Sequence, residues 1–470
     1  MKKAIVRIKS IEISEFKNVK YGCLDLENPR KLYRASVLGL YGQNGSGKTA
    51  VIDAITLLKS VLSGQKIHAK FADFINIDAE FAKLKFELLV SNTDANASYM
   101  AVYEFCLRKM RDDSEKNIEE TNSTAEKNKA VIFNEILSYS YECVDSKKKL
   151  QPIIDTTDGD IFGPQTKYDA LVGKSRAVET DLLVAKKLAA ATSRTFVFSK
   201  ELLAVIREKC KDEIHKFLIE SLVSFGNYEL FVINTANSGL ISMNALPLAF
   251  KYEEKSLSAI GNLMIPLEKP TVIPQDAHSL VKKLIDNMNV VLCQIVPGLT
   301  IGVKDLGVQL LENGKVGAKI QLVSHKNGKG IPLQYESEGI KKIISILQLL
   351  IVVYNKPSIT VAIDELDSGV FEYLLGELLR IISENGKGQL IFTSHNLRPL
   401  ETLDRGFVAF TTTNPENRYI RLSYVKPNHN LRDFYYRDII LGEQDEPVYE
   451  TTNNYEIAFA FREAGELSGS

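Results

Sequence analysis

Hydrophobic and polar residues alternate along several stretches near the start of the chain. In 8–26, Ile11 and Ile13 enclose a glutamate, and the same period of two recurs over 81–90. This alternation is typical of strands that bury one face of a sheet. We therefore expect a hairpin of strands in 8–26, a strand in 81–90 and a partner strand in 99–107.

Other stretches are apolar without interruption or have apolar residues at helical spacing. Residues 36–41 form a short apolar run, which predicts a buried strand, and 49–62 carries apolar residues at the spacing of a helix. The run 340–354 contains two lysines and a glutamine, so it predicts a buried helix rather than a membrane span.

The middle of the chain is less informative. Residues 111–129 are polar and charged without apolar periodicity, which predicts an exposed loop. Residues 131–274 suggest amphipathic helices, but no heptad pattern persists, so no long coiled coil is expected. An acidic trio within this region favours a solvated turn over a metal site; its members are Asp155, Asp158 and Asp160.

Regular patterns resume at about residue 278. A helix is expected from there to 295, followed by strands at 299–303 and 308–311. A hairpin of 318–323 and 331–334 is expected across the turn Lys326-Asn327-Gly328-Lys329-Gly330.

A glycine-rich segment lies between the expected strand 36–41 and the expected helix 49–62. It fits the phosphate-binding pattern G-x-x-x-x-G-K-[ST] and reads Gly42-Gln43-Asn44-Gly45-Ser46-Gly47-Lys48-Thr49. Glycines let backbone N–H groups approach phosphate oxygens, and the helix N-terminus adds partial positive charge. Lys48 is expected to reach the β- and γ-phosphates of ATP, and the Thr49 hydroxyl to ligate Mg²⁺.

A second motif is the β-branched run 359–363 followed by Asp364 and Glu365. Such a strand places two acids at the carboxyl edge of a parallel sheet. We expect Asp364 to hold Mg²⁺, directly or through water, and Glu365 to polarise the attacking water.

Two further segments carry candidate site residues. The run 389–396 predicts a strand that ends near His395, and one helix, 371–383, separates it from the Asp-Glu strand. His395 could contact the γ-phosphate or the attacking water. Ser337 is a candidate helix N-cap, and Gly339 would expose backbone N–H groups at the same helix start.

Composition limits the class of protein. The chain has 470 residues, a formal net charge of −1 and 45% hydrophobic residues, which is ordinary for a soluble protein of more than one lobe. Its balanced charge does not indicate nucleic-acid binding, although a local patch is possible. The five cysteines form no C-x-x-C pair, and neither a signal peptide nor a membrane span is evident, so a reducing cytoplasm is expected.

The order of these motifs resembles the ATP-binding-cassette (ABC) ATPases, and in particular the SMC-like branch. The resemblance covers roughly 1–105 and 280–425, and Ser337-Glu338-Gly339 looks like a reduced form of the family signature. It implies an α/β P-loop NTPase fold with a mixed sheet, an antiparallel β-subdomain and a mostly helical insertion. It also implies that Asp367 belongs to the loop that crosses a dimer interface.

The expected organisation has four parts. They are an ATPase lobe at 1–110, a mostly helical insertion at 111–277, a second ATPase lobe at 278–425 and an extension at 426–470. The glutamine-loop residue of the family cannot be placed, and Gln294 is one weak candidate. The segment after His395 is too short for the Toprim nuclease found in some relatives.

The Glu-Ser-Glu-Gly and Thr-Ser-His-Asn variants are similar to those of prokaryotic anti-phage ATPases, including the overcoming-lysogenisation-defect, abortive-infection and PARIS-type systems. The resemblance implies an Mg²⁺-dependent ATPase that works as a head-to-tail dimer and controls a separate nuclease or toxin. In that dimer Ser337 and Gly339 of one subunit face the nucleotide of the other. Alternatives are a DNA-repair or recombination ATPase that binds DNA ends, and a non-hydrolysing ATP-bound scaffold for a partner protein.

Overall fold

The structure is a computed structural model that describes residues 4–27, 36–92, 97–111, 128–143, 146–254, 257–311, 314, 316–326, 328–422, 430–442 and 444–467. Most of the expected exposed loop at 111–129 lies outside these residues, and 128–129 begin a strand.

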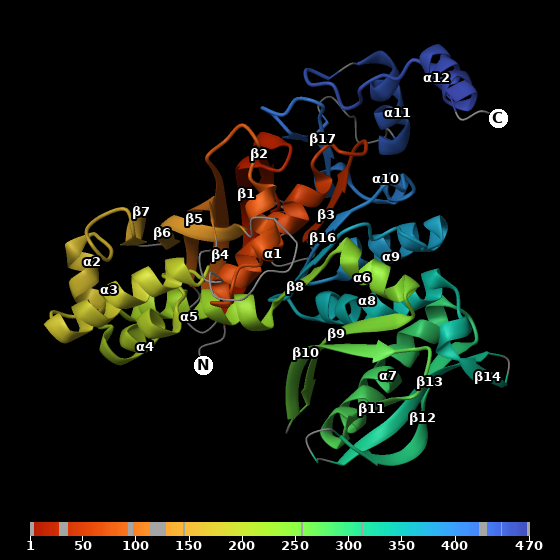
Figure 1. Ribbon diagram of the computed structural model, residues 1–470, viewed down its shortest axis with the longest axis horizontal. Coiled ribbons are helices and arrows are strands. Elements are labelled where there is room, and N and C mark those ends of the chain that lie inside the picture. Colours follow the sequence, from red (N-terminus) through yellow and green to blue (C-terminus); the bar gives the residue numbers. More distant parts are fainter. Residues whose placement is uncertain are drawn as a thin grey trace.

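A parallel sheet lies at the centre of the molecule (Figure 1). Its strand order is β18-β17-β3-β16-β15-β8, and only the edge strand β18 runs antiparallel. The bounds are β3 (Ser36–Tyr41), β8 (Leu230–Ile233), β15 (Thr360–Ile363), β16 (Gln389–Thr393), β17 (Val408–Thr411) and β18 (Tyr419–Ile420). The strands expected at 36–41, 359–363 and 389–396 are therefore confirmed as neighbours, whereas β8 was not foreseen.

Each face of this sheet is covered by its own hydrophobic core. Along β3, Leu38 and Leu40 enter one core while Val37 and Tyr41 enter the other, as the period of two requires. The first core contains α1 (Lys48–Leu62) and α5 (Glu213–Tyr228), and the second contains α7 (Gln275–Ile295), α8 (Glu338–Asn355) and α9 (Glu372–Asn385). The expected helices at 49–62, 278–295, 340–354 and 371–383 are confirmed as α1, α7, α8 and α9.

An antiparallel sheet packs beside α1 and has the order β2-β1-β4-β5-β6-β7. Its strands are β1 (Ala4–Phe16), β2 (Val19–Asp25), β4 (Phe81–Asn92), β5 (Ala97–Arg111), β6 (Asn128–Cys143) and β7 (Ser146–Asp155). The expected hairpin in 8–26 is the pair β1–β2, with Ile11 opposite Leu24. This sheet is the antiparallel β-subdomain that the sequence predicts.

The region expected as a mostly helical insertion, 111–277, is helical mainly over 165–228. Its helices are α2 (Gln165–Leu171), α3 (Arg176–Ala191), α4 (Lys200–Lys209), α5 and α6 (Thr235–Ser242). On either side of this helical part, β6 and β7 extend the antiparallel sheet, and β8 joins the central sheet. Both additions depend on partner strands elsewhere in the chain, which local periodicity does not reveal. The lobe boundaries at 110, 277 and 425 stay a prediction.

The remaining elements form the lobe at lower right of Figure 1 and the extension at upper right. The lobe adds β9 (Ala245–Glu254), β10 (Leu257–Pro266), β11 (Thr271–Pro274), β12 (Leu299–Leu310), β13 (Val316–Lys326) and β14 (Lys329–Pro332). The extension contains α11 (Leu431–Leu441) and α12 (Asn454–Leu467), and α10 (Pro399–Thr402) precedes it. Short 3₁₀ turns occur at Ala69–Phe74, Leu333–Tyr335 and Arg405–Phe407. The two strands expected at 299–303 and 308–311 are one strand, β12, with an irregularity between Asp305 and Val308.

The expectations about membrane spans and about the acidic trio can be compared with the described residues. None of the helices in the described ranges is long and apolar enough to cross a lipid bilayer. Within the same ranges, no group of three or more His, Cys, Asp or Glu side chains is arranged to hold a metal ion. In the acidic trio, Asp155 Oδ1 accepts a hydrogen bond from Thr157 N at 2.9 Å, which is the geometry of a turn.

Candidate functional site

A cavity of about 330 Å³ opens at the carboxyl edge of the central sheet. The strands β3, β15 and β16 run parallel, so the residues that follow them meet at this edge. The cavity is lined by Lys17, Asn18, Asn44, Gly45, Ser46, Gly47, Lys48, Thr49, Ala50, Asp364, Glu365, Thr393 and His395. Motifs more than 300 residues apart in the sequence thus surround one space.

The phosphate loop wraps around the start of α1. Gly47 has φ 93°, a left-handed conformation that favours glycine, and it directly precedes the helix. Gly42 must also lack a side chain, because a Cβ there would lie 1.8 Å from Thr411 Oγ1. The loop therefore turns tightly at glycines that line or adjoin the cavity, and backbone N–H groups in such a turn can bind an anion.

Lys48 lies folded against its own loop. Its ammonium group donates hydrogen bonds of 2.8 Å to the carbonyl oxygens of Gly42 and Gln43. Burial lowers the pKa of Lys48 to about 8, although the carboxylates across the cavity oppose this shift. Phosphate oxygens would give this poorly solvated cation an anionic partner, so the side chain is suited to a phosphorylated ligand.

Asp364 lines the cavity and is fully buried, and only one of its carboxylate oxygens is bonded to a described residue. Oδ1 accepts hydrogen bonds from Thr393 Oγ1 at 2.6 Å and from Thr49 Oγ1 at 3.5 Å. Oδ2 is buried and has no hydrogen-bond partner among the described residues. A buried carboxylate oxygen without a partner is costly, and with the Thr49 hydroxyl nearby it fits the oxygen ligands that Mg²⁺ prefers.

Glu365 follows Asp364 in a strained conformation. Its φ is 48°, in the left-handed region that residues other than glycine seldom adopt, at a cost of about 1–3 kcal/mol. Its backbone N–H donates to Thr393 Oγ1 at 2.8 Å, which fixes this geometry, and its side chain lines the cavity. Thr393 therefore holds both acids, a role that the sequence did not reveal.

His395 lies at the mouth of the cavity and is exposed. Its backbone N–H donates to Asp367 Oδ2 at 3.0 Å, and the N–H of Asn396 donates to the same oxygen at 2.8 Å. Asp367, which the resemblance places at a dimer interface, thus contacts the His395 loop of its own chain.

Ser337 and Gly339 lie at the start of α8 and are not among the residues that line the cavity. Ser337 is exposed and its hydroxyl accepts a hydrogen bond from Ile340 N at 3.3 Å, which confirms the expected N-cap. Gly339 packs on the turn that follows Asp367, because a Cβ there would lie 2.0 Å from Gly369 O. A glycine is therefore needed at position 339 for packing, in addition to the phosphate-binding role that the sequence predicts for it.

The family assignment agrees with this geometry. The family model described as AAA ATPase domain matches residues 7–398. The chain belongs to the AAA ATPase domain family. Its matched part contains every predicted site residue, and the expected α/β P-loop NTPase fold is confirmed. Membership of this family implies that the chain binds ATP.

Solved structures with similar chain traces are distant in sequence. They include an Smc head bound to the C-winged helix domain of ScpA, at 13% identity and a TM-score of 0.42, covering 89% of this chain and 98% of that chain. The SMC head domain from Thermotoga maritima is 14% identical with a TM-score of 0.37, covering 89% and 99%. The structure of the recombination mediator protein RecF-ATPrS is 15% identical with a TM-score of 0.35, covering 88% and 98%. No curated protein matches this sequence.

Two residues of this AAA ATPase domain reach the cavity from the turn between β1 and β2. Lys17 forms an ion pair with Asp53 and lies 4.2 Å from the centre of the Phe74 ring. The Asn18 side chain donates a hydrogen bond to Gly45 O in the phosphate loop. Sequence reasoning missed both, since only the pairing of distant strands brings this turn to the loop.

The weak glutamine-loop candidate of the ATPase is not in the cavity. Gln294 is exposed on α7, and its amide donates to the neighbouring Cys293 Sγ at 3.7 Å. Asn234 follows β8 at the same sheet edge as Asp364, and its Oδ1 is buried with no partner among the described residues. The strand β8, which the sequence did not predict, therefore brings Asn234 to this edge of the sheet. No glutamine-loop residue could be placed from the sequence.

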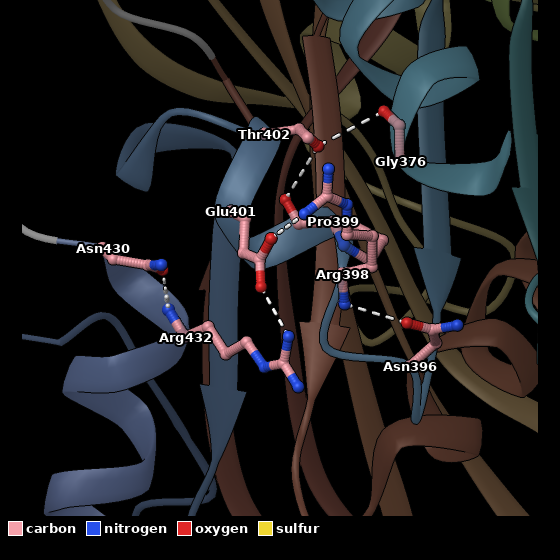
Figure 2. Close-up of polar contacts among 8 residues, drawn as sticks. All are labelled: Gly376, Asn396, Arg398, Pro399, Glu401, Thr402, Asn430 and Arg432. Atoms are coloured by element: carbon pink, nitrogen blue, oxygen red, sulfur yellow. Dashed lines mark hydrogen bonds and ion pairs between the residues drawn. The ribbon is translucent and has the colours of Figure 1, made fainter. Parts of the chain in front are cut away.

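Two contacts join the C-terminal extension of the ATPase to segments around the site. The Glu450 N–H donates to Gln43 Oε1 of the phosphate loop at 2.7 Å. Figure 2 shows the second contact, where Glu401 bridges Arg398 and Arg432 and so joins the segment after His395 to α11.

Proposed function

We propose that the chain binds Mg²⁺-ATP in the cavity at the sheet edge and hydrolyses it there. Lys48 and the backbone of the phosphate loop would hold the β- and γ-phosphates. Thr49 and Asp364 would hold Mg²⁺, which would neutralise phosphate charge. Glu365 would take the proton of the attacking water, and His395 would orient the γ-phosphate or that water.

We further propose that two copies close head to tail around ATP, with Ser337 and Gly339 of each copy acting on the nucleotide of the other. The observation that carries this proposal is the position of Ser337. It caps an exposed helix start, yet it lies outside the cavity lined by its own phosphate loop. A helix N-terminus suits a γ-phosphate, and a second copy would supply one.

ATP would gate such a dimer by mass action. Contacts from both copies to the γ-phosphate exist only with ATP, so hydrolysis removes the differential affinity that favours the closed state. In this reading the chain is the cytoplasmic sensor or regulator of an anti-phage system and controls a separate effector. Two sequence motifs, which are similar to those of anti-phage ATPases, support that assignment. They are Glu336-Ser337-Glu338-Gly339 and Thr393-Ser394-His395-Asn396.

Mixing two inactive variants tests the dimer. Lys48→Ala should lose tight ATP binding, and Ser337→Arg should block the shared face. Each homodimer then has two damaged sites, whereas a mixed dimer has one site with both lesions and one intact site. We expect ATPase activity to return on mixing and to peak near equal proportions. Ser337→Ala, which removes the cap without adding bulk, is the control for helix stability.

The result also separates the alternatives. If mixed dimers form, as measured by chromatography of differently tagged copies, but no activity returns at any ratio, Ser337 does not act across the interface on an independent site. Turnover by isolated monomers at the rate of the dimer would contradict ATP gating altogether.

A further inference from the structure

The helix α12 is exposed along almost its whole length. It has 14 residues, and every residue from Tyr455 to Ala464 is exposed. An isolated helix of fewer than about 12–15 residues is only marginally stable in water, so a helix of this length depends on packing against another surface. The described residues of the same copy do not cover this part of α12.

One face of α12 is aromatic in its first half and acidic in its second half. Tyr455, Phe459, Glu463 and Glu466 follow one another at spacings of four, four and three residues, so they lie on one side of the helix. Tyr455 and Phe459 are 89% and 65% exposed, and both glutamates are exposed. We call these four residues the α12 face. A surface that covers it needs an apolar part beside a basic part.

The start of α12 is held near the phosphate loop. The Glu450 N–H donates to Gln43 Oε1 at 2.7 Å, and only residues 451–453 separate Glu450 from α12. Extended chain between Glu450 and the start of α12 spans at most about 14 Å, so α12 begins close to the loop. In the proposed head-to-tail dimer, this part of one copy meets the start of α8 of the other.

The hairpin of β13 and β14 presents basic and apolar side chains together. Lys326 is paired with Lys329, and Ser324 with Ile331, so these side chains lie on one face of the hairpin. Lys326, Lys329 and Ile331 are exposed. The hairpin therefore has the two kinds of side chain that the α12 face requires.

This hairpin leads directly into the start of α8. The Ser324 hydroxyl donates a hydrogen bond to Glu336 Oε1 at 2.7 Å, and Glu336 directly precedes Ser337. Tyr335, on the other side of Glu336, is 70% exposed. The β14 surface is defined here as Lys326, Lys329, Ile331 and Tyr335. In Figure 1, β14 lies at the lower right and α12 at the upper right, so a single copy does not bring the two together.

We propose that the α12 face of one copy packs on the β14 surface of a second copy. The inference rests on the proposed head-to-tail dimer and adds a contact to it. There, the phosphate loop of one copy lies opposite Ser337 of the other, and α12, tethered to that loop, continues onto the segment that precedes Ser337. By the two-fold symmetry of such a dimer, the contact occurs twice.

The order of side chains agrees on the two surfaces. Along α12, the aromatic pair comes first after the tether, and the glutamates follow over about 16 Å of helix. Going back along the chain from Ser337, Tyr335 and Ile331 come first, and the two lysines follow. The aromatic half of α12 therefore covers the apolar part of the β14 surface, and its acidic half lies beside the basic part.

The first test measures the strength of the ATP-bound dimer in full-length Glu365→Gln, by light scattering over a dilution series with ATP and Mg²⁺. Adding Phe459→Ala should weaken the dimer by about 10- to 100-fold, the range for a buried aromatic side chain in an interface. Phe461→Ala is the matched control, since Phe461 lies on another face of the same helix, and it should leave the dimer unchanged. The affinity of the monomer for ATP should be the same in both.

A charge exchange tests the acidic half of the α12 face. In the same background, Glu463→Lys alone and Lys329→Glu alone should each weaken the dimer by about 2- to 5-fold. Both changes in one chain should restore it, because each contact then joins opposite charges again. A double variant that dimerises no better than the single ones would overturn the proposed pairing.

Photochemical cross-linking identifies the copy that α12 contacts. A benzophenone amino acid at position 459, in a mixture of ¹⁵N-labelled and unlabelled Glu365→Gln chains, should cross-link to residues 326–335 of the other copy, and only with ATP. Cross-links within one copy, or to another region, would overturn the inference. So would an ATP-dependent dimer that is as tight with Phe459→Ala as without it. If Glu365→Gln forms no ATP-dependent dimer at all, the proposed function itself fails.

Discussion

Glu365 combines a reactive group with an unfavourable backbone. Its φ of 48° persists because Thr393 accepts its N–H and the preceding Asp364 is fully buried. Strain of this kind is held in place by surrounding contacts and is concentrated at functional sites. Both side chains line the cavity, but Asp364 is fully buried whereas Glu365 is only partly buried, so two adjacent acids have different environments.

Replacing Glu365 by glutamine tests the role of the carboxylate. The amide keeps the shape but cannot accept a proton, so we expect kcat for ATP hydrolysis to fall by about 10²–10⁴. ATP affinity, measured by calorimetry, should change little. Glu372→Gln, at an exposed acid in the first turn of α9, is the control. Wild-type turnover in Glu365→Gln would show that Glu365 is not the base.

At the scale of elements, the loop after β16 is bonded on one side by the turn at Asp367 and on the other by the segment that leads to α11. The turn at Asp367 bonds its backbone on one side. On the other side, Arg398 N donates to Asn396 Oδ1 at 2.8 Å, and Glu401 joins Arg398 to Arg432 on α11 (Figure 2). These ion pairs thus join the C-terminal extension to the loop after β16. Neutralising the Glu401 carboxylate should weaken this attachment.

The pH dependence of this attachment follows from Glu401. The hydrogen bond from Arg432, with the charges of both arginines, lowers the pKa of Glu401 from its ordinary value of 4.5. The network therefore stabilises the attached state above that ordinary value, and the stabilisation is lost as pH falls through the lowered pKa. We expect amide hydrogen exchange in α11 to be faster in Glu401→Gln than in wild type at neutral pH.

The same difference should shrink as the pH falls through the lowered pKa of Glu401, where the wild-type side chain also becomes neutral. Glu377→Gln is the matched control because its ion pair with Arg380, at 2.8 Å, lies on the exposed face of α9. Equal exchange rates in Glu401→Gln and wild type at neutral pH would mean that the Glu401 ion pairs do not hold α11 in place.

At the scale of the molecule, the proposed dimer would use two separate surfaces of each copy. The cavity lies at one sheet edge, and the capped start of α8 lies outside it. The extension ends in α12, whose Tyr455 and Phe461 are 89% and 77% exposed. Large exposed aromatic side chains of this kind mark contact surfaces, so α12 adds to the expectation that the chain works in an assembly.

Slow hydrolysis should make the assembly visible. With ATP and Mg²⁺, Glu365→Gln should retain the γ-phosphate contacts that favour the closed state, so light scattering should report about twice the mass of one 52.5 kDa chain. Adding Lys48→Ala in the same chain should restore the monomer because ATP no longer binds tightly. A mass that does not respond to ATP would contradict the gated dimer.

The sequence by itself determined the local elements and the chemical groups. The loop 42–49, the Asp-Glu strand, the His395 strand and the Ser337 cap were predictable because each depends on residues within one element or turn. The strands β3, β15 and β16 were likewise visible as apolar runs, and their parallel order put the acids at the loop.

Only the tertiary structure decided what depends on distant pairing. Strands β6, β7, β8 and β11 form where partner strands exist elsewhere in the chain, and β9 pairs with β10, so the region expected as mostly helical contributes strands to all four sheets of the described residues. Lys17, Asn18 and Asn234 reach the site edge, and Gln294 does not, for the same reason. The contact of Gly339 with Gly369, and the grip of Asp367 on the His395 loop, arise from packing between elements, about which the spacing of residues along the chain carries no information.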